Sequence, residues 1–347
     1  MLYPIKINNK YGFIDSVGNV AIVPQYDLAY QFSCGCAVVA KGDKVGVINE
    51  SNELVIPFIF ARNSTHYCYQ EDMFFAAGYG FFNTEGDLKI KLPNFASTSF
   101  TNGYAPVCQN LSWGKSQSLL SMRNPVMRCG MIDTSGNIII PPEYDRIGFF
   151  SENLCPVCKE IDNNGVKKKL WGFVNTQNEI VEDFKYGCWG GGFKENRIAV
   201  WLSDDDKLGY IDSDFQVKIP FQFRNAGAFN EGMAVVQNNN YNGYSGYCNL
   251  AGEICIPCKF AYANSFSGDL AVVSSKRKWG FIDKNGEFVI SPQFTAAFDF
   301  YHGLGSVLLN KSQQAYITKT GEIIFTCEKQ ISCLRAAKSC PQTAMYC

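Results

Sequence analysis

The sequence predicts an all-β protein made of tandem three-stranded antiparallel repeats, about eight complete units and a partial ninth. Two observations carry this prediction. A glycine recurs with a period of about 34 residues, and an aromatic residue follows it 14 residues later in six of eight copies. The residues around both positions alternate with the period of a β-strand. Repetition over nearly the whole chain indicates that most of the sequence encodes architecture rather than chemistry.

The first half of the unit is clearest in residues 278–286. Trp279 and Phe281 alternate with smaller residues, as expected of a strand. Asp283 then begins a tight turn, because its side chain can accept hydrogen bonds from the backbone two residues on. Gly286 closes the turn, since glycine readily adopts the left-handed conformation that such a hairpin requires.

The second half of the unit returns as an aliphatic strand over residues 288–290. We expect Pro292 to end this strand, because proline has no N–H to donate to a ladder. Phe294 follows as an anchor, and a short polar coil then leads to a third strand over residues 306–309.

Three positions of the unit recur along the chain. The glycine is found at Gly12, Gly46, Gly80, Gly130, Gly172, Gly209, Gly246 and Gly280. The aromatic anchor is found at Tyr26, Phe60, Tyr144, Phe223, Phe260 and Phe294, with Phe95 one residue late and Phe184 two residues early. A second aromatic is found at Phe32, Phe100, Phe150, Phe193, Phe229, Phe266 and Phe300. We expect these rings to form the core between stacked units.

The repeated motif resembles the WG-repeat family, also called KWG-type, which is found chiefly in bacteria. The resemblance is carried by motifs such as Trp279-Gly280-Phe281-Ile282-Asp283, Trp171-Gly172-Phe173-Val174-Asn175 and Tyr11-Gly12-Phe13-Ile14-Asp15. It weakens at Val45-Gly46 and Cys129-Gly130, where the tryptophan is replaced. The resemblance implies a tandem β-repeat protein with a general use in binding, and it carries over no catalytic residues.

The two ends of the chain hold incomplete units. Residues 2–7 supply a third strand before the first repeat, and residues 315–325 supply the first two strands of a ninth. Together they would complete one unit, which a closed propeller-like ring needs and an open array would show as two loose ends. Three strands a unit fall short of the usual four-stranded propeller blade, so the sequence favours an open or superhelical β-solenoid.

Composition and charge narrow the possible partners. Hydrophobic residues make up 46% and charged residues 18%, and the net charge is −1, so no long-range field favours nucleic acid or anionic lipid. The first twenty residues lack the apolar core of a secretory signal, and no apolar stretch is long enough to cross a membrane. We therefore expect a cytoplasmic protein that binds neither nucleic acid nor membrane.

The domain prediction is a repeat array over residues 1–326, followed by a cysteine-containing tail or cap over residues 327–347. The chain has 15 cysteines, and two pairs match C-x-x-C: Cys155 with Cys158, and Cys255 with Cys258. Two such pairs can form a zinc site. The repeat register places both pairs in strands, where residues three apart point to opposite faces. We interpret the cysteines as small apolar residues with free thiols in a reducing cytosol, and predict no metal or cofactor.

Departures from the repeat are the candidate binding positions, because insertions in repeat proteins map to loops on one face. The main departures are residues 62–72, 108–128, 160–169 and 187–192. Trp113, Trp189 and Trp201 are predicted binding anchors, because aromatic residues are enriched at interface hot spots; the alternative is that they fill gaps in the core. The runs 167–169 and 204–206 are interpreted as solvated loop charge.

Signals of catalysis are poor. The sequence contains neither a G-x-S-x-G elbow nor a dinucleotide fingerprint, and its two histidines, His66 and His302, lie in different repeats. His302 is predicted to be a surface turn residue. The sequence therefore predicts a non-enzymatic scaffold that binds a protein. A carbohydrate- or small-ligand-binding module and a metal- or thiol-dependent enzyme are the alternatives.

Overall fold

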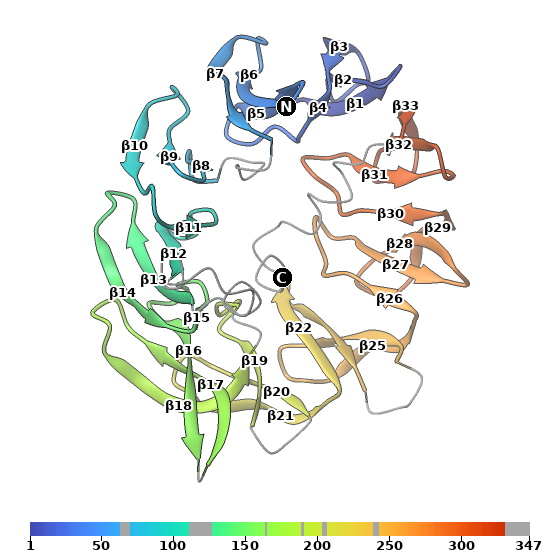
Figure 1. The fold of residues 1–347 in the computed structure, drawn as a ribbon. Helices are drawn as coiled ribbons and strands as arrows, with labels where there is room; N and C mark the ends of the chain where they lie inside the picture. The colour runs from blue at the N-terminus through green and yellow to red at the C-terminus, as the bar shows by residue number, and fades with distance from the viewer. Residues whose placement is uncertain are drawn as a thin grey trace. The chain divides into compact units, whose positions relative to one another are not determined.

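The structure, a computed structural model, describes residues 1–62, 70–110, 127–163, 165–188, 191–202, 207–238 and 243–329. Every helix or strand among these residues is a β-strand, as Figure 1 shows. Accordingly, the described part of the chain contains no helix that could span a membrane. These residues form two compact units, one made of residues 1–32 and 194–329 and the other of residues between 33 and 193. The predicted all-β class is confirmed.

In the first unit, strands that follow one another within a sheet pair antiparallel. They are β1 (Tyr3–Ile7), β2 (Lys10–Ile14), β3 (Val20–Tyr26), β4 (Leu28–Ala29), β19 (Ile198–Leu202), β20 (Leu208–Ile211), β21 (Val217–Phe223), β22 (Asn225–Asn230), β23 (Met233–Gln237), β24 (Ser245–Asn249), β25 (Ile254–Phe260), β26 (Tyr262–Ala263), β27 (Ala271–Ser275), β28 (Lys278–Ile282), β29 (Phe288–Phe294), β30 (Ala296–Ala297), β31 (Gly305–Leu308), β32 (Gln313–Ile317) and β33 (Ile323–Glu328). Strands β1–β3 form a three-stranded sheet, and β22–β25, β26–β29 and β30–β33 form four-stranded sheets.

The second unit follows the same plan. Its strands are β5 (Cys36–Lys41), β6 (Lys44–Asn49), β7 (Leu54–Ala61), β8 (Phe74–Ala76), β9 (Gly80–Phe82), β10 (Leu88–Lys91), β11 (Ala96–Ser97), β12 (Tyr104–Asn110), β13 (Met127–Asp133), β14 (Ile138–Tyr144), β15 (Arg146–Ile147), β16 (Cys155–Asn163), β17 (Val166–Val174) and β18 (Ile180–Cys188). Strands β11–β14 form a four-stranded sheet and β8–β10 a three-stranded one. Strands β15–β18 pair in chain order as well.

The sheets contain a strand that the sequence did not predict. In the sheet β26–β29, the two-residue strand β26 pairs with β27 through Tyr262 opposite Ser274 and Ala263 opposite Val273. A two-residue strand is too short to produce a periodic pattern, so the expectation of three strands a unit was wrong for such sheets. The strand predicted as third in each unit is the second strand of the next sheet, and the sequence repeat therefore straddles two sheets.

The expectation that Pro292 ends its strand was also wrong, because β29 continues to Phe294. Strand β29 bulges here: Trp279 pairs with Phe294 and Phe281 with Ile290, so three residues lie opposite one. Proline is tolerated because β29 is the edge of its sheet and needs no inward N–H at this point. The bulged backbone crosses close over Gly280, where a Cβ would lie 2.5 Å from the Ile290 carbonyl oxygen. This contact explains the recurring glycine.

The aromatic residues form the core, as predicted. The six anchors in register are between 1% and 4% exposed, and the second aromatics Phe32, Phe229 and Phe266 are at most 1% exposed. In the fifth repeat the aromatic anchor is Tyr186 and not the predicted Phe184. Tyr186 lies 14 residues after Gly172, is 4% exposed and pairs with Trp171. Phe184 is half-buried and packs against the cluster that contains Tyr144.

Neighbouring sheets of the first unit stack through the glycine of the aspartate turn. A Cβ at Gly286 would lie 2.9 Å from Ile256 Cγ2, and one at Gly321 would lie 3.4 Å from Ile290 Cγ1. A Cβ at Gly18 would lie 3.1 Å from Ile324 Cγ2, so the N-terminal sheet stacks on the C-terminal sheet as any repeat stacks on its predecessor. Tyr316 adds a hydrogen bond of 2.7 Å to the Pro4 carbonyl oxygen. The predicted open or superhelical course of the array stays a prediction.

Candidate binding surface

The sequence-predicted anchors are not brought together among the described residues. Trp113 and Trp189 lie outside those residues, as do His66 and the acidic run 204–206. Trp201, on β19, is half-buried and packs against the cluster that contains Leu208 and Phe223. Its role in binding therefore stays a prediction. The placement of His302 in an exposed turn is confirmed, with φ of 47°.

A two-residue turn recurs directly before each of the strands β5, β8, β12, β16, β19, β23, β27 and β31. In the second unit it spans residues 33–36, 70–73, 101–104 and 151–154, and in the first unit residues 194–197, 230–233, 267–270 and 301–304. Both central residues of every turn have positive φ, between 47° and 97°. This is the type I′ geometry, which favours Gly, Asn and Asp. The second central residue is Gly, Asn or Asp in all eight turns, a signal that the sequence analysis read only as a polar coil.

The aspartate turns lie at the same end of the sheets as these two-residue turns. In the sheet β26–β29, the turn 267–270 precedes β27 and the turn 283–286 follows the antiparallel β28. Lys284 links the two kinds of turn, with its Nζ 3.3 Å from both Asp269 and Glu231 carboxylate oxygens. We call this end of the sheets the turn end. The opposite end, where the hairpin between these two strands closes, is the hairpin end.

Glutamate side chains tie three of these turns to the turn that follows in the chain. Glu231 accepts hydrogen bonds from the backbone N–H groups of Gly268 at 2.6 Å and Asp269 at 3.0 Å. Glu195 accepts one from Gly232 at 3.0 Å, and in the second unit Glu71 accepts one from Gly103 at 2.8 Å. Because the N–H groups of such a turn would otherwise face solvent, these charge-assisted bonds hold the turn end in one conformation.

The aspartate turns are held in a similar way. The Asp283 carboxylate accepts hydrogen bonds from the backbone N–H groups of Glu287 and Asn285, both at 2.9 Å. The bond from Glu287 is the main reason that the pKa of Asp283 lies below its ordinary value. Asn49 and Asn175 occupy the equivalent position in other repeats and accept the same bonds. A residue that recurs in this role is structural.

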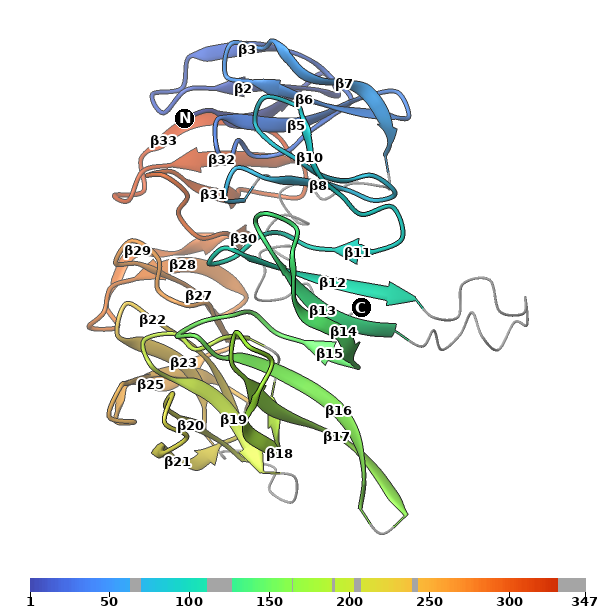
Figure 2. The same ribbon diagram turned by 90° about the vertical axis from the view of Figure 1, so that its left-hand side faces the viewer.

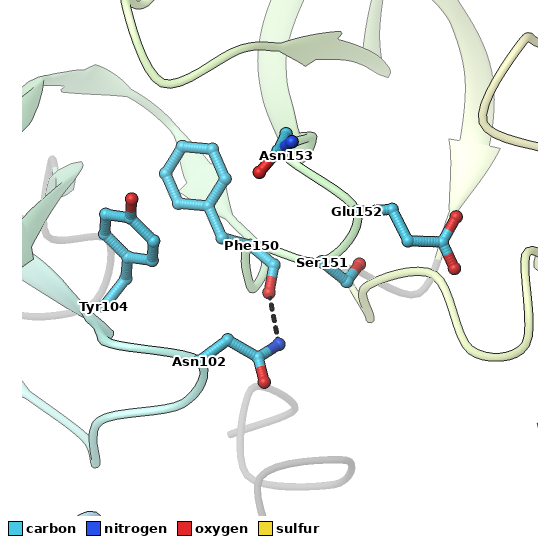
Figure 3. Close-up of a pocket in the computed structure, with 6 residues that line it drawn as sticks. All are labelled: Asn102, Tyr104, Phe150, Ser151, Glu152 and Asn153. Atoms are coloured by element: carbon cyan, nitrogen blue, oxygen red, sulfur yellow. Dashed lines mark hydrogen bonds between the residues drawn. The ribbon is translucent and has the colours of Figure 1, made fainter.

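A hollow of about 320 Å³ opens at the turn end of the second unit. It lies between two neighbouring turns and is lined by Asn102, Tyr104, Phe150, Ser151, Glu152 and Asn153 (Figure 3). Its wall is fixed by a hydrogen bond of 2.7 Å from Asn102 Nδ2 to the Phe150 carbonyl oxygen. The rings of Tyr104 and Phe150 pack against each other with centroids 4.6 Å apart. The hollow is therefore partly apolar and partly polar.

The connections at the hairpin end vary in length, whereas the turns before β5, β8, β12 and their counterparts at the turn end all have two central residues. The connection is two residues long at 276–277 and sixteen at 111–126. The predicted insertion 160–169 is instead mostly strand, because β16 and β17 are nine residues each and form a hairpin that Figure 2 shows projecting from its sheet. Two of the four predicted departures, residues 108–128 and 160–169, therefore lie at the hairpin end. Residues 62–72 lie between β7 and β8, and residues 187–192 run on from the end of β18, so the insertions do not all map to one end of the sheets.

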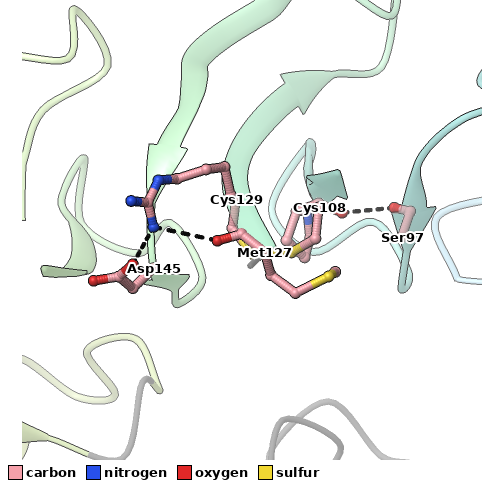
Figure 4. The surroundings of a disulfide bond; sticks show 7 residues. Ser97, Cys108, Met127, Cys129 and Asp145 are labelled. Atoms are coloured by element: carbon pink, nitrogen blue, oxygen red, sulfur yellow. Dashed lines mark hydrogen bonds and ion pairs between the residues drawn. A yellow bond between two sulfur atoms is a disulfide. The ribbon is translucent and has the colours of Figure 1, made fainter. Parts of the chain in front are cut away.

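One pair of cysteines forms a disulfide, contrary to the expectation that all cysteines are free thiols. Cys108 and Cys129 lie opposite each other on β12 and β13, with Cα atoms 4.1 Å apart, and form a disulfide (Figure 4). Arg128 next to it forms an ion pair with Asp145. The sequence separation of 21 residues does not reveal this pairing, because a strand register across an insertion is not encoded in spacing.

The C-x-x-C cysteines do not form a metal site. Cys155 and Cys158 point to opposite faces of β16, and both are buried because both faces are covered. Burial raises the pKa of the Cys158 thiol to about 11 and that of Cys155 still further, so both stay protonated at neutral pH and are poor nucleophiles. Among the described residues, no three His, Cys, Asp or Glu side chains are grouped to hold a metal ion.

Comparison with known proteins agrees with the repeat architecture. A family described as WG containing repeat matches residues 11–44, 79–113, 130–160, 209–241, 246–279 and 279–311. No curated protein matches the sequence. The crystal structure of a eukaryotic initiation factor is similar with a TM-score of 0.54 and 11% identity, over 94% of this chain and 95% of that one, which shows a shared fold. BamB from Moraxella catarrhalis has a TM-score of 0.36 and 9% identity, over 94% and 96%.

Proposed function

This chain belongs to the family of proteins with WG-containing repeats, and we propose that it is a non-enzymatic scaffold that binds a protein partner through the turn end of its sheets. One observation carries the proposal. The turns keep one backbone geometry while their first central residue changes from repeat to repeat. That residue is Cys34, Glu71, Asn102, Glu152, Glu195, Glu231, Gly268 or His302.

A fixed backbone with variable side chains suits recognition. The hydrogen bonds between turns order these residues before any partner arrives, so binding would lose little conformational entropy. Repeat proteins generally bind through a surface to which every repeat contributes one element. Burial raises the pKa of the Cys36 and Cys158 thiols to about 11, which makes both poor nucleophiles at neutral pH and supports the non-enzymatic assignment. Cys34, at the turn end, is exposed.

The proposal is tested by changing side chains at the turn end while keeping residue types that favour the same turn. Replacing the pairs Glu71-Asp72 and Glu152-Asn153 by Asn-Gly keeps the preferred type I′ residues and removes the native side chains. The hairpin end offers a matched control, because Lys276 and Arg277 form the same turn with φ of 49° and 62° and can be replaced by Asn-Gly too.

Partners are captured from the native cell with the unchanged chain, and the purified partner is then titrated against each variant. We expect the turn-end variant to bind at least tenfold more weakly and the control variant to bind as well as the unchanged chain. A partner that is lost by the change at residues 276–277 and kept by the turn-end variant would refute the proposal.

A further inference from the structure

The hollow between the turns 101–104 and 151–154 combines an aromatic wall with hydrogen-bonding groups that are mostly uncharged. We propose that it binds a neutral sugar, either a single pyranose residue or a disaccharide. The inference goes beyond the proposed function, because a sugar can occupy the hollow without a protein partner. Its support comes from the size of the hollow, from its uncharged polar groups and from its rings.

The hollow has the size and rigidity of a small-ligand site. Its volume of about 320 Å³ lies near the lower limit of the range of about 300–1,000 Å³ that is usual for small-molecule sites. The bond of 2.7 Å from Asn102 Nδ2 to the Phe150 carbonyl oxygen joins the two repeats that form it. Asn102 and Asn153 are held in their turns with φ of 54° and 62°. A site that is ordered in advance loses little entropy when a ligand binds.

Uncharged side chains supply the hydrogen-bonding groups that remain for a ligand. The hydroxyl of Ser151 is buried and makes no hydrogen bond to the described residues. Asn102 uses only its Nδ2, and the Asn153 amide and the Tyr104 hydroxyl make no hydrogen bond to the described residues. Glu152 also lines the hollow, but it already has an interaction partner. Amides and hydroxyls both donate and accept hydrogen bonds, as the hydroxyls of a sugar do.

The aromatic wall favours a ligand that has an apolar face. The rings of Tyr104 and Phe150 pack with centroids 4.6 Å apart, and Figure 3 shows both on one side of Ser151. A pyranose ring carries C–H groups on its faces and hydroxyls around its rim. One face of a sugar can therefore cover the half-buried ring of Tyr104 while its hydroxyls reach the polar groups beside it.

Other classes of ligand would satisfy fewer of these groups. An apolar molecule would cover the rings and leave the amides and the Ser151 hydroxyl unpaired, which is costly in a partly buried site. An inorganic anion lacks an apolar face, and an ammonium group donates hydrogen bonds without accepting any. A sugar can donate to the Asn102 Oδ1 and accept from the Asn153 amide at once. Because these residues belong to different turns, the sugar would bridge two repeats.

The test uses the full chain and a panel of sugars. Methyl glycosides of glucose, galactose, mannose and N-acetylglucosamine, together with maltose, cellobiose and lactose, are titrated while the side-chain amide resonances of Asn102 and Asn153 are followed by NMR. Cyclohexanemethanol keeps a saturated ring with one hydroxyl, and acetylated, amidated Gly-Gly-Asn-Gly-Gly offers an amide without a ring. We expect saturable shifts with at least one sugar and at least tenfold weaker binding of both controls.

Variants sharpen the test. Asn153→Gly keeps a residue suited to positive φ and removes the amide, so it should weaken binding of the best sugar about tenfold. Asn196→Gly makes the same change at the same position of the turn 194–197 in the other unit and should alter binding less than twofold. Ser151→Ala should weaken binding about fivefold. Thermal unfolding confirms that each variant is folded.

Three results would overturn the inference: no sugar of the panel saturates the amide shifts, either control binds as well as the best sugar, or Asn153→Gly binds that sugar unchanged. A free sugar and a glycan attached to a protein share the same chemistry. Enzymatic deglycosylation of a captured partner distinguishes these sources, because only a glycan-dependent partner would then be lost.

The two proposals fail separately. If a partner is lost by the turn-end variant and no sugar saturates the hollow, the sugar site is wrong and the scaffold function stands. If a sugar saturates the hollow and depends on Asn153, but no partner depends on the turn end, the site stands and the scaffold function is wrong.

Discussion

The turn end and the hairpin end of the sheets differ in how much the conformation and length of their connections vary. At the turn end all eight two-residue turns have positive φ at both central residues, and in three of them an N–H group donates a hydrogen bond to a glutamate of the preceding turn. At the hairpin end the connections range from two residues at 276–277 to sixteen at 111–126. The difference teaches that contact with the next repeat, rather than strand pairing, restricts loop length. A connection that touches its neighbour cannot grow.

The largest expected effect tests whether the core beneath the turn end is tightly packed. Phe266 is fully buried, with its ring 4.9 Å from that of Tyr247. Replacing Phe266 by Ala should lower the free energy of unfolding by about 3–5 kcal/mol, because it removes burial and leaves a cavity. Tyr262→Ala in the same repeat is the control, since Tyr262 is 65% exposed and its loss should cost less than about 1 kcal/mol. Similar losses in urea unfolding would contradict the tight packing.

The next effect concerns the base of the longest hairpin connection. The Cys108–Cys129 disulfide closes a loop of 21 residues, and by the chain-entropy estimate it stabilises the folded state by about 3 kcal/mol. A reductant should therefore lower the melting temperature of the unchanged chain and expose two additional thiols to titration. The double variant Cys108→Ala/Cys129→Ala should be insensitive to reductant. A thiol count that reductant does not change would show that the pair is not bonded.

A smaller loss of stability is expected when one glutamate at the turn end and one at the hairpin end are replaced in turn. Glu231 accepts two backbone hydrogen bonds from the next turn, so Glu231→Gln should cost about 1 kcal/mol. Glu160 forms a surface ion pair of 2.9 Å with Lys167 at the hairpin end, and Glu160→Gln should cost less than about 0.5 kcal/mol. Both are measured by chemical unfolding. If the Glu160 variant lost more stability, the turn end would not be the more tightly constrained end.

The smallest effect is a pH dependence. Because the pKa of Asp283 is lowered in the folded state, its contribution to stability is present above the ordinary value of 3.8 and is lost as pH falls through the lower folded value. Asp283→Asn should keep the turn, since Asn49 serves there in another repeat, and should lessen the loss of stability below pH 3.8. The melting temperature of both proteins between neutral and acid pH measures this. Parallel curves would show that Asp283 is not responsible.

Much of the repeat could be predicted from the sequence because the rings and glycines recur in register. The aspartate turns and the buried anchors follow from local chemistry and from hydrophobic periodicity. The two-residue strands and the bulge at Pro292 were missed, because both depend on which strand lies alongside. The Cys108–Cys129 pairing was missed for the same reason. Tyr186 was overlooked because the nearer Phe184 is the more typical core residue.

The candidate site was less accessible to sequence reasoning. Tryptophans were chosen as anchors for their chemical type, whereas the hollow is made of residues such as Ser151 and Asn153 that look like ordinary turn residues. Their importance comes from two turns of different repeats meeting, which spacing alone does not reveal. The Gly, Asn or Asp at the second central position of every turn was the available signal.

The glutamate bonds between turns have a consequence for rearranging this protein. Glu195 reaches Gly232 and Glu231 reaches Gly268, always from one repeat to the one that follows it in the chain. A repeat is thus not a self-contained cassette, because part of what fixes its loop is encoded by its predecessor. Anyone who shuffles or duplicates these repeats should transplant them as adjoining pairs.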